Sequence, residues 1–232
     1  MIDNLCEFYC LNYNNLDNKK SMTERFKKLN INCNFYNGID HNDEKIKILY
    51  NKYNNCIYCM YGHINMIYDF YHNKNKLYGI FCEDDIVIHK DFKNKLIEII
   101  NNFKNLKLDV LLLGYLITIN ISNNNYIDYK NINENYYEYP DDLWGTQMYM
   151  LSRDSAKAIL DIYYDGLSYM EMSLNKKLPP LSADWTITKY GKRALYFPLL
   201  VIENNQKKYN DHGQHNLHHF TFVNNYINEE YI

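Results

Sequence analysis

The feature that most constrains the fold is the stretch 77–88, where an apolar run stops at three consecutive acidic residues and a second apolar run follows. A short apolar run with aromatic and β-branched residues is typical of a buried strand. Glu83, Asp84 and Asp85 end that strand, and unpaired charges are costly to bury. A bound Mg²⁺ or Mn²⁺ would neutralise them, because hard cations prefer carboxylate oxygens and open α/β sheets bind ligands where their strands end. A helix N-cap or a solvated turn is the alternative interpretation.

Strand-like and helix-like segments alternate along most of the chain. Strands are predicted over 5–11, 34–36, 77–83, 109–114, 147–151, 194–197 and 199–202, and helices over 43–53, 56–71, 91–103 and 152–164. Residues 21–24 have the form of a capping box that opens or re-initiates a helix ending at Leu29, and Ser182 is expected to cap a short helix. Residues 117–139 are expected to form a loop or a peripheral hairpin. The alternation predicts an α/β sandwich with a largely parallel sheet.

Composition bounds the class of protein. The 232 residues are enough for one domain with its own core, and we expect that domain over 1–203, followed by a polar, His-rich tail over 204–232. Tyr is abundant, and so are Asn, Ile and Lys, for which an AT-rich genome is the simplest cause. The net charge of −3 gives no general argument for nucleic acid or anionic membrane as a partner. No apolar run is long enough to cross a membrane and no secretory signal is visible, so we expect a cytoplasmic protein.

The sequence also lacks several common signatures. No glycine-rich dinucleotide fingerprint and no P-loop are present, which disfavours those two nucleotide-binding classes. Cys56 and Cys59 form a CxxC pair, but no second pair completes a zinc site. Because the pair falls in a helical pattern, we interpret these residues as buried apolar thiols.

Six short segments, in order along nearly the whole chain, resemble glycosyltransferase family 25, which includes lipooligosaccharide galactosyltransferases and collagen hydroxylysine galactosyltransferases. They are Leu11-Asn12-Tyr13 with Asn18-Lys19-Lys20, Phe35-Tyr36-Asn37-Gly38-Ile39-Asp40, Cys59-Met60-Tyr61-Gly62-His63, Phe81-Cys82-Glu83-Asp84-Asp85, Gly145-Thr146-Gln147-Met148-Tyr149-Met150-Leu151-Ser152 and Ser182-Ala183-Asp184-Trp185. Two departures stand out: Asn18-Lys19-Lys20 replaces the usual Arg pair, and Gly62 replaces a Ser. Lys keeps the charge but loses the bidentate phosphate geometry of Arg.

The resemblance implies a GT-A fold, a nucleotide-sugar donor and a divalent metal, Mn²⁺ or Mg²⁺. Asp85 is the expected metal ligand and Glu83 its near partner, while Asp84 points the other way if the strand stays extended. Glu83 and Asp84 are also assigned to the donor. The remaining donor residues expected from the resemblance are Asn12, Lys20 and Thr146.

A third metal ligand is expected near the end of the chain, where His212 or His215 would supply it. The alternative is a disordered polar tail.

Asp184 is the expected catalytic residue, taking the proton of the acceptor hydroxyl as a general base. A helix-start Asp stabilised by the helix dipole is the alternative. Asp141 and Asp142 are second choices. Trp144 either stacks on a sugar ring or belongs to the core.

His63 has two interpretations. One is a hydrogen-bonded core histidine, and the other is a residue that orients the acidic site.

The resemblance therefore implies a metal-dependent transferase that moves galactose or glucose from a UDP-sugar to a hydroxyl group. The acceptor would be hydroxylysine or galactosyl-hydroxylysine of a collagen-like protein, or a surface glycan. A large viral genome would fit the AT-rich composition and the absent secretion signal, with the protein in host cytoplasm or virion. Two alternatives remain open: a non-catalytic module that binds a glycan or partner on the same fold, and a metal-dependent nucleotidyltransferase.

Overall fold

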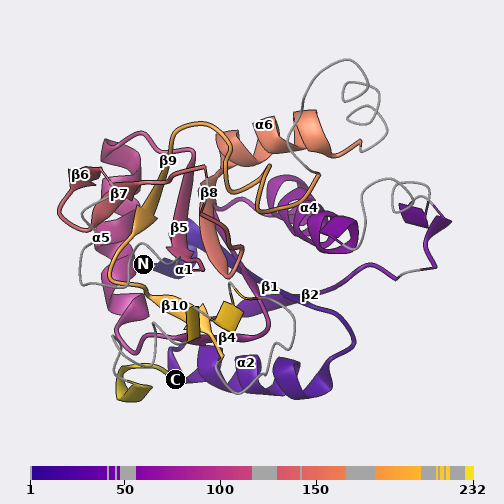
Figure 1. The fold of residues 1–232 in the computed structure, drawn as a ribbon, viewed down its shortest axis with the longest axis horizontal. Coiled ribbons are helices and arrows are strands. Elements are labelled where there is room, and N and C mark those ends of the chain that lie inside the picture. Colours follow the sequence, from indigo (N-terminus) through magenta and orange to yellow (C-terminus); the bar gives the residue numbers. More distant parts are fainter. Residues whose placement is uncertain are drawn as a thin grey trace.

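A mixed β-sheet of eight strands runs through the described part of the molecule (Figure 1). The computed structural model describes residues 2–40, 42–44, 46–47, 56–116, 130–141, 143–165, 181–204, 213, 215–216, 218–219 and 228–232. In order across the sheet, the strands are β2 (Cys33–Asn37), β1 (Cys6–Asn12), β3 (Tyr78–Glu83), β8 (Met148–Ser152), β5 (Val110–Gly114), β9 (Arg193–Tyr196), β7 (Tyr136–Glu138) and β6 (Asn131–Asn133). β1 runs parallel to β2 and β3, and β5 to β9, whereas β8 lies antiparallel between β3 and β5.

Helices cover both faces of this sheet. α4 (Cys56–Asn73) and α6 (Arg153–Tyr163) pack on one face, and α2 (Leu16–Lys28) and α5 (Phe92–Asn105) pack on the other (Figure 1). Strand side chains alternate between the two cores, so Tyr9 and Phe81 face α4 while their neighbours Cys10 and Cys82 face α2 and α5. The result is a three-layer α/β fold, as the alternation of segments predicted. The sheet is mixed and not largely parallel as expected, because β8, β7 and β6 pair antiparallel with their neighbours.

A second, two-stranded sheet shapes the region after the acidic turn. β4 (Ile86–Ile88) pairs antiparallel with β10 (Val201–Glu203), which sets Glu203 opposite Ile86. The backbone N–H of Asn204 donates to the carbonyl oxygen of Asp85 at 2.7 Å. This pairing brings a late segment of the chain against the end of β3, a contact between residues more than a hundred positions apart.

The chain ends also pack against the body. α1 (Ile2–Leu5) precedes β1, and a short 3₁₀ helix, η3 (Asn228–Glu230), precedes the C-terminal residues. Ile232 exchanges backbone hydrogen bonds of 3.0 and 2.9 Å with Ile88, and the Tyr231 hydroxyl donates to the carbonyl of Leu199 at 2.7 Å. The last three residues of the chain, 230–232, are therefore held against β4 and the residues next to it.

Several expected element boundaries are wrong. α2 begins at Leu16, because the Asn15 side chain accepts a hydrogen bond from the Asn18 N–H at 3.0 Å and caps the helix. Ser21 therefore lies inside α2 and opens nothing. Residues 183–189 form consecutive turns, and the Ser182 hydroxyl has no hydrogen-bond partner within the described residues, so it caps no helix.

Other expectations hold or lie outside the described residues. Ser152 caps α6, its hydroxyl accepting from the Ser155 N–H at 3.0 Å. The helix expected over 43–53 lies mostly outside the described residues, and so does most of the segment 117–139, whose described end forms the β6–β7 hairpin. None of the helices in the described ranges has the length and apolar character needed to span a bilayer.

Candidate functional site

The acidic turn lies where β3 gives way to β4, beside the carboxyl end of the parallel strand β1. Asp84 is held there by two amide groups: Asn12 Nδ2 donates to its Oδ2, and Asn18 Nδ2 donates to its Oδ1 at 3.0 Å. Asn12 Nδ2 also donates to the Asn15 carbonyl at 2.8 Å. Asp84 thus joins the acidic turn to the end of β1 and the first turn of α2.

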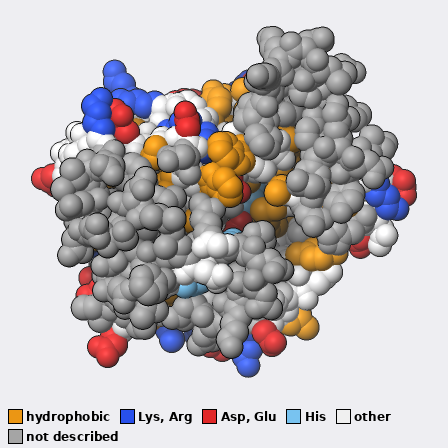
Figure 2. Space-filling model, viewed as in Figure 1, with side chains coloured by type: hydrophobic (Ala, Val, Ile, Leu, Met, Phe, Trp, Pro, Cys, Tyr) orange, Lys and Arg blue, Asp and Glu red, His pale blue; other side chains and the backbone are white. Residues whose placement is uncertain are grey.

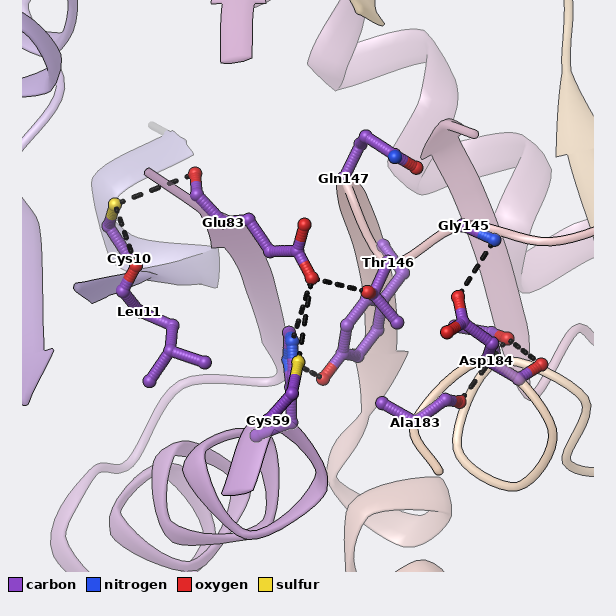
Figure 3. Close-up of polar contacts among 12 residues, drawn as sticks. Cys10, Leu11, Cys59, Glu83, Gly145, Thr146, Gln147, Ala183 and Asp184 are labelled. Atoms are coloured by element: carbon purple, nitrogen blue, oxygen red, sulfur yellow. Dashed lines mark hydrogen bonds and ion pairs between the residues drawn. The ribbon is translucent and has the colours of Figure 1, made fainter. Parts of the chain in front are cut away.

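The Glu83 carboxylate faces a cluster of donors from α4 and β8. Its Oε1 accepts a hydrogen bond from the Thr146 hydroxyl at 2.6 Å and from the Cys59 thiol at 3.6 Å, and His63 Nε2 lies 3.7 Å away (Figure 3). His63 is fully buried, and its Nδ1 contacts the Tyr149 hydroxyl at 2.9 Å. Burial raises the pKa of Glu83, but His63 and Thr146 outweigh it and hold that pKa below its usual range. Glu83 is therefore an anion at neutral pH.

Asp184 lies across Thr146 from Glu83 (Figure 3). Its Oδ1 accepts a hydrogen bond from the Gly145 N–H at 2.9 Å. Burial and the charge of Glu83 raise the pKa of Asp184 to about 6, and the Gly145 N–H offsets only part of this. A carboxyl group with a pKa near the working pH is suited to accept a proton and release it again.

Gly145 is required by the backbone that presents this N–H. Its φ is +136°, a conformation that side chains rarely adopt, and a Cβ there would lie 2.2 Å from Gln147 Oε1. The Leu116 N–H donates to the carbonyl of Trp144 at 2.9 Å, which fixes the segment from the other side. The strained segment before β8 therefore aims one backbone donor at Asp184.

Two cavities meet at Glu83. One has a volume of about 330 Å³, and its lining residues are Leu11, Tyr13, Gly38, Ile39, Tyr58, Cys59, Glu83, Asp84 and Asp85. The other has a volume of about 530 Å³, and its lining residues include Trp144, Gly145, Thr146, Gln147, Asp184, Glu203 and His215. Cys59 and Glu83 line both. Figure 2 shows a hollow near the centre of this face, with acidic and histidine side chains visible between hydrophobic ones.

Glu203 forms a second buried carboxylate centre in the larger cavity. It accepts a hydrogen bond from Gln147 Nε2 at 3.0 Å, and His215 Nδ1 lies 2.9 Å from its Oε2. His219 Nε2 lies 3.2 Å from the same oxygen. Burial raises the pKa of Glu203, but the two imidazoles outweigh burial and bring that pKa to about 2. The hydrogen bond to Glu203, with the charges of Asp85 and Glu83, raises the pKa of His215 against its partial burial.

The site residues expected from the sequence fall into distinct groups. Glu83, Asp84, Asp85, Thr146 and Asp184 line the two cavities, and Asn12 donates a hydrogen bond to Asp84. Lys20 is exposed on α2 and does not line either cavity. His212 and Asp142 lie outside the described residues.

Exposure and contacts bear on three other expectations. Asp141 is exposed and pairs with Arg193. Trp144 is 40% exposed, so it is not a core residue. Cys56 is exposed and only Cys59 is partly buried, so the interpretation of both as buried thiols is wrong for Cys56, which lies on the open first turn of α4.

Two contributors were missed from the sequence. Glu203 gave no local signal beyond an acid at the end of a short apolar run, and the role of Gly145 depends on a backbone angle. Asn18 was noticed only as part of a departure from the family pattern.

Comparison with known proteins gives one informative match. The model of the family described as Glycosyltransferase family 25 (LPS biosynthesis protein) matches residues 8–172, which include the acidic turn and Thr146 but not Asp184. A search of curated proteins found no match to the chain.

Solved structures resemble the chain only distantly. A197 from STIV is 11% identical, with a TM-score of 0.46, and the match covers 82% of this chain and 81% of that one. A glycosyltransferase involved in the glycosylation of the major capsid of PBCV-1 is 9% identical, with a TM-score of 0.47 and coverage of 94% and 99%. Mannose-1-phosphate geranyltransferase from Thermus thermophilus is 8% identical, with a TM-score of 0.46 and coverage of 82% and 73%. With TM-scores below 0.5, these likenesses carry no functional inference.

Proposed function

The chain belongs to glycosyltransferase family 25, and we propose that it transfers galactose or glucose from a UDP-sugar to an acceptor hydroxyl group with the help of a divalent cation. The observation that carries this proposal is the meeting of two cavities at one acidic edge of the sheet. Glu83 lines both cavities, and Asp184 faces the larger one with a raised pKa. A donor and an acceptor bound on the two sides of Glu83 would meet beside a proton-accepting carboxylate.

The smaller cavity suits the nucleotide. The ring of Tyr13, 41% exposed, offers a face on which a base can stack. Gly38 lies in tight contact with Tyr13, since a Cβ at Gly38 would be 2.8 Å from Tyr13 Cβ. Asp84 is already hydrogen-bonded on both oxygens, by Asn12 and Asn18, so we assign it to holding the turn in shape for the donor and not to direct contact.

The cation would lie at Asp85, with Glu83 and His215 close by. The donor set fits Mn²⁺ or Mg²⁺, because carboxylate oxygens dominate and one imidazole is at hand. His215 lines the larger cavity, and the charges of Asp85 and Glu83 both raise its pKa. Because His212 lies outside the described residues, we assign the third ligand to His215. When bound, such a cation neutralises the charge that develops on the departing diphosphate.

The proton chemistry falls to Asp184. Its carboxylate accepts the proton of the acceptor hydroxyl, the acceptor oxygen bonds to the anomeric carbon, and the bond from that carbon to the diphosphate oxygen breaks. UDP leaves with the bonding electron pair. The Gly145 N–H keeps Asp184 oriented during this step.

The acceptor would enter beside Trp144. This ring lies 5.5 Å from that of Trp185 in an edge-on arrangement, and it is exposed at the wall of the larger cavity. An exposed indole can pack against a pyranose ring, which supports a glycan or galactosyl-hydroxylysine acceptor. Hydroxylysine of a collagen-like protein belongs to the same proposal.

The test is UDP release by the purified protein with Mn²⁺ and a panel of UDP-sugars, with and without collagen peptides or glycans. We expect turnover with UDP-galactose or UDP-glucose, and its loss in Asp184→Asn with donor binding retained. Failure to bind or turn over any UDP-sugar would refute the proposal. Pyrophosphate release from a nucleoside triphosphate would indicate a nucleotidyltransferase. Metal-independent donor binding that survives Asp85→Ala would indicate a binding module.

A further inference from the structure

We propose that Cys59, His63 and Glu83 form a binding site for Zn²⁺ that lies beside the hard-cation site at Asp85 and shares Glu83 with it. The three side chains come from adjacent turns of α4 and from the end of β3. One ligand atom of each lies within 4.8 Å of the others. A thiol, an imidazole and a carboxylate together are a donor set typical of zinc, whereas Mn²⁺ and Mg²⁺ favour oxygen alone.

Two of the three separations between the ligand atoms match a zinc site. Bonds of about 2.3 Å to sulfur and about 2.0–2.1 Å to nitrogen and oxygen, at near-tetrahedral angles, place ligand atoms about 3.3–3.8 Å apart. The Cys59 sulfur lies 3.6 Å from Glu83 Oε1, and His63 Nε2 lies 3.7 Å from the same oxygen. Little rearrangement is needed to admit the ion.

His63 supplies the second, independent observation. It is fully buried, yet its Nε2 has no hydrogen-bond partner in the described part of the chain, and the 3.7 Å to Glu83 is too long for a good hydrogen bond. A buried ring nitrogen whose one charged neighbour is too far for a good hydrogen bond is costly, and a cation between it and Glu83 would remove that cost.

The surroundings of the cluster provide the other parts that a metal site needs. The Tyr149 hydroxyl contacts His63 Nδ1 at 2.9 Å, so a proton on Nδ1 leaves the Nε2 lone pair directed at the site. The Thr146 hydroxyl holds the Glu83 carboxylate at 2.6 Å. Cys59 and Glu83 line both cavities, which gives the ion two entry paths from solvent. Binding would displace the thiol proton of Cys59 to the solvent.

The experiment is titration of the metal-free protein with Co²⁺, followed by absorption spectroscopy and then by competition with Zn²⁺. Neither donor nor acceptor is present, so the outcome does not depend on the proposed transferase activity. We expect one equivalent of Co²⁺ to give a thiolate-to-cobalt charge-transfer band in the near ultraviolet, and Zn²⁺ to abolish it. Cys59→Ser removes the band and weakens Zn²⁺ binding by at least about tenfold.

Matched variants separate this site from its neighbours. Cys56→Ser, one turn earlier on α4 and exposed, keeps the band, and so does Asp85→Asn. Circular dichroism confirms that each variant is folded. The absence of a charge-transfer band in the wild type, its persistence in Cys59→Ser, or its loss in Cys56→Ser would each overturn the proposal.

Discussion

The ionised Asp184 side chain is expected to lower the free energy of unfolding of the metal-free protein at neutral pH. The substitution Asp184→Asn is therefore expected to stabilise the fold while it abolishes turnover. The carboxylate is largely buried and lies near the charge of Glu83, and both effects favour its protonated form. Asparagine has nearly the same shape and keeps an oxygen for the Gly145 N–H, which donates at 2.9 Å. The substitution therefore removes the charge and little else.

The size of the effect follows from the pKa. A folded-state pKa of about 6 lies about two units above the usual value of about 3.9, and each unit corresponds to about 1.4 kcal/mol. This gives an upper value of about 3 kcal/mol, which partial solvent access reduces to about 1–3 kcal/mol. Because the folded state holds the proton more tightly, this cost is absent below about pH 4, grows as pH rises, and is complete above about pH 6.

The assay is urea unfolding of both proteins in EDTA from pH 4 to pH 8. We expect the two to have nearly equal free energies of unfolding at pH 4, and Asp184→Asn to be more stable by about 1–3 kcal/mol at pH 7. Asp141→Asn is the control, because its carboxylate side chain is 86% exposed. A stability difference that does not change with pH, or a variant less stable at pH 7, would refute the account of Asp184.

Four further outcomes follow from the same geometry. In the proposed reaction, kcat/KM rises with pH as Asp184 loses its proton near pH 6. A cation bound nearby shifts this rise to lower pH. A pH–rate profile that is flat from pH 5 to 8 would contradict the assignment of Asp184 as the base. Asp85→Asn lowers Mn²⁺ affinity at least about tenfold by calorimetry with unchanged circular dichroism, and equal affinity would remove Asp85 from the cation site. Gly145→Ala costs about 2–4 kcal/mol in urea unfolding, since φ is +136° and its Cβ would clash; an unchanged midpoint would exclude strain there. Glu203→Gln lowers the free energy of unfolding by about 1–3 kcal/mol at pH 6. This difference fades as pH falls from about 4.5 toward 2, because the wild-type carboxylate then gains its proton. A stability loss that is independent of pH would argue against the pairing of Glu203 with His215.

The sequence predicted the parts of the site that are marked by a pattern of neighbouring residues. The acids at 83–85 end an apolar strand, and that pattern alone places them at the edge of a sheet. The α/β alternation likewise predicted the layers. The antiparallel direction of β8 was not predictable in this way, because strand direction depends on how the whole sheet is connected.

What escaped prediction depends on pairings between distant parts of the chain. Glu203 reaches the site only because β10 pairs with β4, and nothing in the residues around it specifies that partner. The start of α2 was misplaced because two local signals compete, and Asn15 caps the helix ahead of Ser21. Capping by Asn15 also places Asn18 in the first turn of α2, where it donates to Asp84. A local capping preference thus helps to build the part of the site proposed to bind the sugar donor.

The carboxylates of the site differ in how many donors each one faces, and this difference assigns their roles. Asp84 is met by two amide groups, and Glu83 and Glu203 by hydroxyl, amide or imidazole groups that lower their pKa values or hold them in place. Asp184 is met by backbone N–H groups, chiefly that of Gly145, and these do not outweigh burial and a nearby negative charge. A carboxylate saturated with donors is a poor base, because accepting a proton would break the hydrogen bonds that stabilise its charge. Asp184 is thus the carboxylate in this group best suited to take a proton, and the others are suited to hold charge in a fixed position.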